Sequence, residues 1–296
     1  MHAARDLENT GSPDGLEALA AVASQSGAHS FDSRTPRRVA RAWGDLVEGF
    51  SSRRLATALA MLDLKNRYRG SVLGPFWVTL STAAMLLGVG LLYGHLLAMP
   101  LAEYLPHLAV SLVVWNVMAG AVNDSCTTMI GSEGIIRQLR VPYTVHALRC
   151  MSRNAILALH NLPLVILIFL FFGHIPGWEA LMALPGLALL AINILSACFL
   201  LGMICARFRD IGPIVSSVMQ LAFFMTPVIW KPDQLSHQWL LLINPFYAML
   251  EVIRGPLVAG GASAIVWTIA IALTAVHAAV AFAFFARFRG RIAFWV

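Results

Sequence analysis

The sequence predicts an all-α polytopic membrane protein with six transmembrane helices. Of its 296 residues, 58% are hydrophobic and only 12% are charged, and the mean hydropathy is +0.73. Soluble domains usually have about a quarter of their residues charged. A helix needs roughly 20 mostly apolar residues to cross about 30 Å of hydrocarbon. Six segments meet this requirement: residues 74–97, 106–128, 155–173, 181–205, 211–230 and 263–286.

The distribution of Lys and Arg supports six spans and predicts their orientation. Nineteen of the 21 Lys and Arg residues lie before the first span, after the last span, or in the second and fourth connections. The other two, Lys231 and Arg254, lie between the fifth and sixth spans. By the positive-inside rule, both termini are expected in the cytoplasm. The net charge of +6 follows from the same bias, so nucleic-acid binding is not needed to explain it.

Two kinds of segment are expected before the first span. Residues 1–40 mix Ser, Gly, Pro and charged residues and lack the apolar core of a signal peptide, which predicts a mobile cytoplasmic tail. In residues 41–72, the side chains of Trp43, Leu46, Val47 and Phe50 recur at i, i+3, i+4 and i+7. This spacing predicts an amphipathic helix lying in the cytoplasmic interface. The alternative is a basic flank that only orients the first span.

The connection at residues 231–262 is divided into short apolar pieces by Pro232, Pro245 and Pro256. Apolar runs of about 10–14 residues are typical of interfacial or re-entrant segments, and Pro interrupts a helix. We therefore expect two short re-entrant helices, near 236–243 and 246–254, that dip into the outer leaflet. Glu251 and Arg254 lie three residues apart on one helical face, where each can neutralise the other. The alternative is an amphipathic loop that rests on the membrane.

Motifs for enzymatic chemistry are missing from the sequence. There is no GxxxxGK[ST] phosphate loop, and neither of the two lysines, Lys65 and Lys231, follows a glycine. ATP hydrolysis is therefore not expected on this chain. The nine histidines form no HxxH or HExxH pair, so no metal site is expected. Asp124, the only acidic residue in a predicted span, is interpreted as a cap or a partner for an arginine.

Aromatic residues in the predicted spans are candidates for lining a pathway. They are Phe76, Trp77, Phe223, Phe224 and Trp230. Aromatic belts at the two membrane interfaces are the ordinary explanation for such residues. Phe223 and Phe224, however, lie away from the span ends, and a sugar chain could slide along their rings.

Several blocks of the sequence resemble a known family. They are DLKNRYRGSVLGPFW (63–77), GIIRQLRVPYTVHALRCMSRNAILALHN (134–161), ARFRDIGPIVSSVMQLAFFMTPVIW (206–230), NPFYAMLEVIRGPL (244–257) and ARFRGRIAFWV (286–296). Together, in this order, they resemble the permease subunit of type-II ABC exporters, and most closely the branch that exports O-antigen and related surface polysaccharides. The resemblance covers roughly residues 50–296.

This resemblance implies a homodimer in the bacterial inner membrane, associated with two copies of a separate ABC nucleotide-binding subunit. The channel would form between the two permeases within residues 73–296 and would carry a lipid-linked polysaccharide. Residues 130–145 would form a coupling helix, and the helices of 231–262 would be extracytoplasmic gates. ATP and Mg would bind the partner subunit, and this chain would need no cofactor. A permease of the same architecture for a teichoic-acid-type polymer, a lipid or a drug is the alternative.

The resemblance also suggests roles for individual residues. Those expected at the ATPase contact or inner channel mouth are Glu133, Arg137, Gln138 and Arg140. Those expected near a lipid-linked pyrophosphate at the inner interface, where cationic donors are favourable, are Lys65, Arg67, Tyr68 and Arg69. Those expected at the outer gate are Asn244, Pro245, Glu251 and Arg254. For the arginines, the alternative is that they satisfy the positive-inside rule and bind lipid phosphates.

Two other classes of protein fit the sequence less well. A membrane-embedded enzyme would need a constellation of carboxylates or histidines, which the sequence does not show. A secondary transporter usually has several buried charges and inverted repeats with broken helices. Only one region, 231–262, looks broken, and no repeat is evident.

Overall fold

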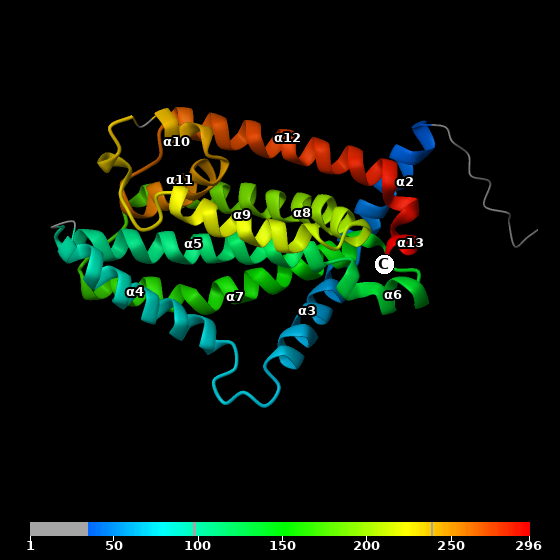
Figure 1. Cartoon of the computed structure of the whole chain (residues 1–296), viewed down its shortest axis with the longest axis horizontal. Helices are drawn as coiled ribbons and strands as arrows, with labels where there is room; N and C mark the ends of the chain where they lie inside the picture. Colours follow the sequence, from blue (N-terminus) through cyan, green and yellow to red (C-terminus); the bar gives the residue numbers. More distant parts are fainter. Residues whose placement is uncertain (1–34, 97–98, 238) are drawn as a thin grey trace, which may run out of the picture. The chain divides into compact units, whose positions relative to one another are not determined.

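The computed structural model describes residues 35–96, 99–237 and 239–296, and all regular structure in these ranges is helical (Figure 1). The chain forms two units, residues 1–40 and 41–296, and the architecture below is that of the second unit. Residues 1–34 of the expected tail lie outside the described residues. The rest of the expected tail belongs to the start of helix α2 (Thr35–Ser51).

Five helical stretches in the described residues are long and apolar enough to cross a membrane. They are α4 (Phe76–Leu96), α5 (Leu101–Thr127), α7 (Tyr143–Phe171), η3 (Trp178–Met182) with α8 (Ala183–Arg207), and α12 (Ala264–Phe288). The remaining predicted span, 211–230, contains α9 (Ile211–Met225), which has 15 residues. At 1.5 Å per residue this helix is about 22 Å long, which is less than the hydrocarbon thickness. The count of six spans therefore stays a prediction.

Helix α7 contains most of the predicted span 155–173 but begins earlier, at Tyr143. Arg149 and Arg153 led to the late start because charged residues are costly inside a span. In the structure both guanidinium groups form ion pairs with carboxylates, and the helix continues through them. The 130–145 connection consequently contains η2 (Ile130–Ser132), α6 (Glu133–Gln138) and the first residues of α7.

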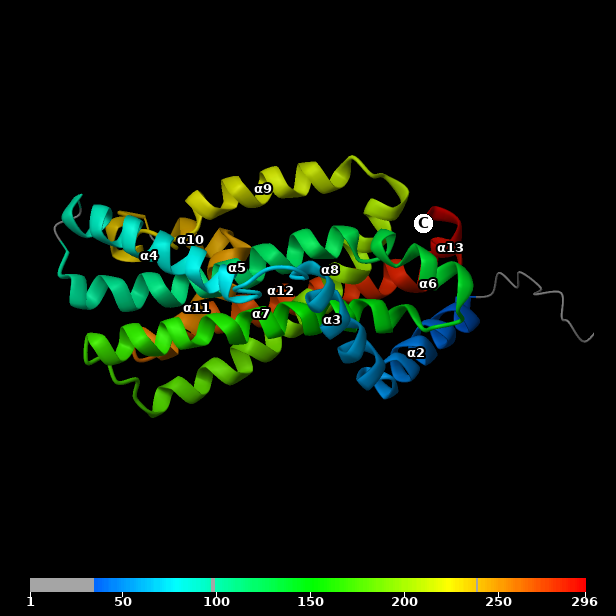
Figure 2. The ribbon, with the colours of Figure 1, turned by 90° about the horizontal axis from the view of Figure 1, so that it is seen from below.

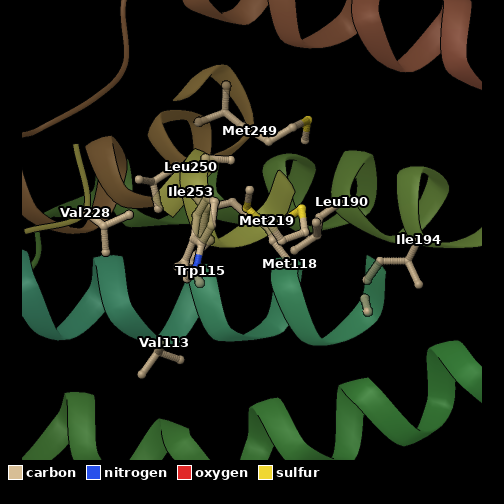
Figure 3. Packing of buried hydrophobic residues seen from close by; sticks show 14 of the residues in the cluster. Val113, Trp115, Met118, Leu190, Ile194, Met219, Val228, Met249, Leu250 and Ile253 are labelled. Atoms are coloured by element: carbon tan, nitrogen blue, oxygen red, sulfur yellow. The ribbon is translucent and has the colours of Figure 1, made fainter. Parts of the chain in front are cut away.

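Helix α5 is the centre of the bundle and packs against α4, α7, α8, α9 and α11 (Pro245–Val258). In its most apolar stretch 72% of the residues are buried, compared with 17% in α4. Figure 3 shows the core around Trp115 and Met118 of α5, which lie beside Met219 of α9 and Leu190 of α8. Helix α9 runs along the outside of the bundle and packs mainly on α5 (Figure 2).

Small residues let α4 approach α5 closely. Gly90 and Gly94 lie one turn apart on the face of α4 that meets α5. A Cβ atom would lie 2.4 Å from Leu105 Cδ2 if placed at Gly90, and 2.5 Å from Leu101 Cδ2 if placed at Gly94. Small residues are the usual means by which helices pack closely in membranes. Most other residues of α4 are exposed, so the packing of Gly90 and Gly94 on α5 holds the C-terminal half of α4 on the bundle.

The amphipathic segment is helical in the structure. It consists of residues 41–51 of α2 and of α3 (Arg53–Arg67), and α3 packs on α7. Trp43, Val47 and Phe50 are exposed, as expected for a stripe that faces lipid. Asp45, on the opposite side of α2, is buried.

The connection at 231–262 contains η4 (Pro232–Gln234) and two further short helices, α10 (Trp239–Ile243) and α11. Asn244 separates α10 from α11, and its side chain accepts a hydrogen bond from Phe246 N (3.0 Å) and so caps α11. The two helices lie near the predicted positions. Below, the end of the bundle that carries them is called the α10 end, and the opposite end, with α6 and α13 (Ile292–Trp295), is called the α6 end (Figure 1).

Candidate functional site

A row of polar residues runs along α5 from its middle to the α6 end. These residues recur at about one-turn intervals and form what we call the α5 polar face: Asn116, Gly120, Asn123, Asp124 and Thr127. All five are partly or fully exposed in the single chain, although α5 is otherwise the most buried helix. Polar groups inside a membrane are costly unless they meet partners or water. This face is therefore a functional candidate.

Side chains from three neighbouring helices hydrogen-bond to the α5 polar face. Asn116 Nδ2 donates to Thr82 Oγ1 of α4 (3.2 Å). Ser216 Oγ of α9 donates to Asn123 Oδ1 (2.8 Å). Asn154 Nδ2 of α7 donates to Asp124 Oδ2 (3.0 Å). Helices α4, α7 and α9 are thus each tied to this face by polar contacts.

A polar groove of about 470 Å³ adjoins this face, between α4, α5 and α7. Its polar lining residues are Arg67, Tyr68, Ser81, Thr82, Asn116, Asp124, Asn154 and Asn161. Of the residues predicted near a pyrophosphate, Arg67 and Tyr68 line the groove, whereas Lys65 and Arg69 are exposed and do not. The Oδ1 atom of Asn161 is buried without a hydrogen-bond partner in the described structure.

An ion-pair network adjoins this groove and holds α3 against α5 and α7. Arg149 makes a bidentate contact with Asp63, with one N–H···O distance of 2.6 Å. Arg153 bridges two carboxylates, at 3.2 Å from Asp63 Oδ2 and 2.9 Å from Asp124 Oδ2. The prediction of an arginine partner for Asp124 is confirmed. The four side chains are 17–22% exposed, so they form one largely buried, charge-balanced cluster.

Asp45 connects α2 to two other elements of the bundle. Its carboxylate accepts hydrogen bonds from the amides of Tyr143 (3.2 Å) and Thr144 (3.0 Å) at the first turn of α7. The same carboxylate pairs with Arg289 at 2.8 Å. A negative charge at a helix N-terminus is favourable, since the first amides have no partner within the helix. Asp45 thereby anchors the amphipathic segment to the start of α7 and the end of α12.

Helix α6 presents most of its polar side chains to solvent at the α6 end. Arg137 pairs with Glu133 at 3.0 Å and donates to the carbonyl oxygen of Val296. Gln138, Leu139 and Arg140 are exposed. The structure therefore brings the four predicted coupling residues into one short surface segment, in which Arg137 is partly engaged within the chain.

The predicted aromatic residues fall into two separate groups. Phe223 packs on Trp115 of α5 (ring centroids 5.7 Å apart) and on Phe224 (5.3 Å). Trp230 Nε1 donates to the carbonyl oxygen of Phe224 (3.3 Å), so Trp230 belongs to the same group. Phe76 and Trp77 lie instead at the start of α4, where both are exposed and Phe76 contacts His160.

The exposed surface of α9 is both polar and aromatic. Ser216, Ser217, Gln220 and Phe224 are exposed along it. Ser216 and Ser217 also hydrogen-bond to backbone carbonyl oxygens of α9, whereas the exposed Gln220 would lack a partner in lipid. The surface lies beside the α5 polar face, to which Ser216 is hydrogen-bonded.

Arg254 forms a buried network at the α10 end. Its Nη1 donates to Pro227 O (2.6 Å), Ser111 Oγ (3.0 Å) and His107 Nε2 (3.2 Å). Its Nη2 pairs with Glu251, which confirms the pairing predicted from their spacing. The residue is only 2% exposed, so the network ties α11 to α5 and to the turn after α9.

Asn244 and Pro245, at the α10 end, also connect elements. Asn244 Nδ2 donates to Thr226 Oγ1 (2.9 Å) and to Met225 O (3.3 Å), which links the start of α11 to the end of α9. Pro245 occupies the first position of α11, where its missing amide hydrogen is not needed.

Several residues of the site were missed in the sequence. On α5, the spacing of Asn116, Gly120, Asn123 and Thr127 at i, i+4, i+7 and i+11 would have shown a polar stripe within a predicted span. Asn154 and Asn161 of α7 are seven residues apart, so they also show polar residues recurring on one helical face. For His107, Ser111 and Asp45 no local pattern indicates a partner, because their partners are distant in the sequence.

Comparisons with known proteins show which family the chain resembles. The family model described as "ABC-2 type transporter" matches residues 54–258. The O-antigen export system permease protein RfbA of Myxococcus xanthus is 26% identical over 208 residues, which cover 69% of this chain and 80% of that protein. Two O-antigen export system permease proteins RfbA of Klebsiella pneumoniae are each 23% identical over 202 residues, which cover 66% of this chain and 77% of those proteins.

Proposed function

The chain belongs to the ABC-2 type transporter family, and from this membership we propose that it is the permease subunit that exports a lipid-linked surface polysaccharide. The relatives named above are O-antigen export permeases, which supports a glycan of this class as the substrate. The observation that carries the proposal is the α5 polar face. A hydroxyl-rich polymer needs hydrogen-bonding partners through the membrane, and this face supplies them within the most central helix.

In this proposal a second copy of the chain completes the channel. One copy leaves the α5 polar face and the polar, aromatic surface of α9 uncovered on neighbouring helices. Two such surfaces facing each other would enclose a pathway whose polar groups are shielded from lipid. Helix α9 and the turn after it would serve as the fifth of six spans, and α10 and α11 would act as gates at the outer end.

A separate ATPase subunit would supply the energy. The chain has no phosphate loop, so ATP and Mg would bind that partner. We place the contact at the exposed segment of α6, with the α6 end and both termini in the cytoplasm and the protein in the bacterial inner membrane. Movement of α6 would reach the bundle through η2 and α13, which both contact α6 and α8.

Deletion of the coding sequence in cells tests the proposed function. Surface glycan should disappear while lipid-linked glycan accumulates on the cytoplasmic side, and a plasmid copy of the chain should restore export. Unchanged surface glycan would contradict a polysaccharide substrate. The alternative would then be a permease of the same architecture that exports a teichoic-acid-type polymer, a lipid or a drug.

The charge reversal Arg137→Glu should uncouple ATP hydrolysis from export. Disrupting a charge pair at an interface commonly costs about 2–5 kcal/mol, so export should fall at least about tenfold while the protein still reaches the membrane. The swap Glu133→Arg/Arg137→Glu is the matched control, because it restores the internal ion pair but not an ATPase contact. If the double variant exports at the wild-type rate, Arg137 serves only in its ion pair with Glu133 and does not contact the ATPase subunit.

Removal of the ring at Phe224 should slow export without loss of stability. The ring is 69% exposed, so Phe224→Leu leaves no cavity in the core. Aromatic contacts are worth about 0.5–1.5 kcal/mol, which corresponds to a decrease of about two- to tenfold. Phe171→Leu, at a ring on α7 that is 79% exposed, is the matched control and should export normally. A normal rate for Phe224→Leu would remove this ring from the pathway.

A further inference from the structure

A pocket of about 560 Å³ opens at the α10 end and has no part in the function proposed above. It lies between the first turns of α5, η4, α11 and the loop that leads into α12. Its chemically active lining residues are Glu103, His107, His174, Lys231, Asp233, Tyr247, Glu251 and Arg254. Ligand pockets commonly measure about 300–1,000 Å³, so this volume suits a small molecule or a short piece of a polymer.

Most charges in this pocket already have partners. Glu103 Oε2 lies 3.6 Å from Lys231 Nζ, and Glu251 pairs with Arg254. Tyr247 differs, because its hydroxyl makes no hydrogen bond within the described structure although the residue as a whole is only 8% exposed, so the hydroxyl faces the open space of the pocket. This hydroxyl, together with the carboxylate of Asp233, is available to a ligand.

The lining selects for a neutral ligand rich in hydroxyl groups. A divalent cation would compete with Lys231 and Arg254 for two of the three carboxylates. An anion such as a lipid phosphate would meet Glu103, Asp233 and Glu251. An apolar ligand would leave charged groups without water, which is costly. Hydroxyl groups both donate and accept, so they can bind carboxylates, the ammonium group and the phenol together.

We propose that this pocket binds sugar residues of a glycan as it leaves the membrane. The inference rests on the proposed function, since the glycan is the proposed substrate. The hydroxyl of Tyr247 and the carboxylates would bind the sugar hydroxyls. Each copy of the chain would carry one such outer site, which would favour forward movement of the polymer.

Thiol labelling in cells tests this site. Ala102, on the first turn of α5, is exposed and lines the pocket, so Ala102→Cys reports occupancy without removal of a binding group. Ala264→Cys is the matched control, because Ala264 is exposed on the first turn of α12, also at the α10 end, but does not line the pocket. The four native cysteines are buried, so they should react little with a membrane-impermeant maleimide.

The labelling rate is compared between cells that export the glycan and cells in which glycan synthesis is blocked. A site that is two-thirds occupied should slow labelling of Ala102→Cys about threefold during export. Ala264→Cys should be labelled at the same rate in both. Adding Tyr247→Phe, which removes only the hydroxyl, should abolish the protection at Ala102→Cys while the protein remains folded and in the membrane.

The outcomes separate the two proposals. Equal labelling of Ala102→Cys in both kinds of cell, with normal surface glycan, would overturn the sugar site and leave the export function intact. Protection that persists with Tyr247→Phe would also overturn it. Surface glycan that does not depend on the chain at all would instead contradict the proposed function.

Discussion

Replacement of Arg254 by Met should abolish export and strongly destabilise the protein. The guanidinium group is buried and hydrogen-bonds to Pro227 O, Ser111, His107 and Glu251. Removal of one partner of a buried ion pair costs about 3–5 kcal/mol, because the other charge remains buried and unpaired. The same change releases α11 from α5, so the outer helices would lose their fixed position. Thermal unfolding in detergent and surface glycan in cells provide the two measurements.

The double variant Arg254→Met/Glu251→Gln is the control for this prediction. It removes the orphaned negative charge, so part of the lost stability should return. Full recovery is not expected, because Ser111 and the carbonyl oxygen of Pro227 still lack their donor. An Arg254→Met protein with wild-type stability would contradict the buried network.

Replacement of Arg153 by Met should destabilise the protein and weaken the hold on α3. Arg153 is the only residue in the described structure that bridges Asp63 of α3 and Asp124 of α5. Its removal leaves Asp124 without its charged partner and weakens the hold on α3, at a cost of about 3 kcal/mol. We expect a lower unfolding temperature and export below about a tenth of the wild-type rate, because the end of α3 carries Arg67, which lines the groove.

The double variant Arg153→Met/Asp124→Asn distinguishes charge balance from lost contacts. Both changes neutralise a charge, so the cluster keeps the pair of Arg149 with Asp63 and loses the orphaned carboxylate. Stability should recover more than export, since Asp124 also belongs to the α5 polar face. Equal recovery of both would restrict Asp124 to a structural role.

The membrane helices could be predicted from the sequence because apolar runs and charge segregation are local signals. The start of α7 could not, because its arginines are paired with residues far away in the chain, such as Asp63, 86 residues before Arg149. The ion pair of Glu251 with Arg254, by contrast, could be predicted from their spacing of three residues alone. Ser111 is 143 residues from Arg254, and its contact requires the fold.

The candidate site could be predicted only in part. The aromatic residues of α9 and the exposed segment of α6 stand out in the sequence by residue type and position. The α5 polar face has a visible period, but its meaning depends on which neighbours leave it uncovered, and helix packing decides this. The outer pocket combines residues from α5, η4 and α11, so no single stretch of the sequence shows it.

The reactivity of a cysteine at position 116 tests the central claim that the α5 polar face lines an aqueous pathway. A charged thiol reagent needs water and a thiolate, so Asn116→Cys should react at least about tenfold faster than Leu87→Cys, an exposed position on α4 in the same bilayer. Labelling of Asn116→Cys should also fall when glycan is being exported. Equal and slow reaction at both positions would contradict a pathway along α5.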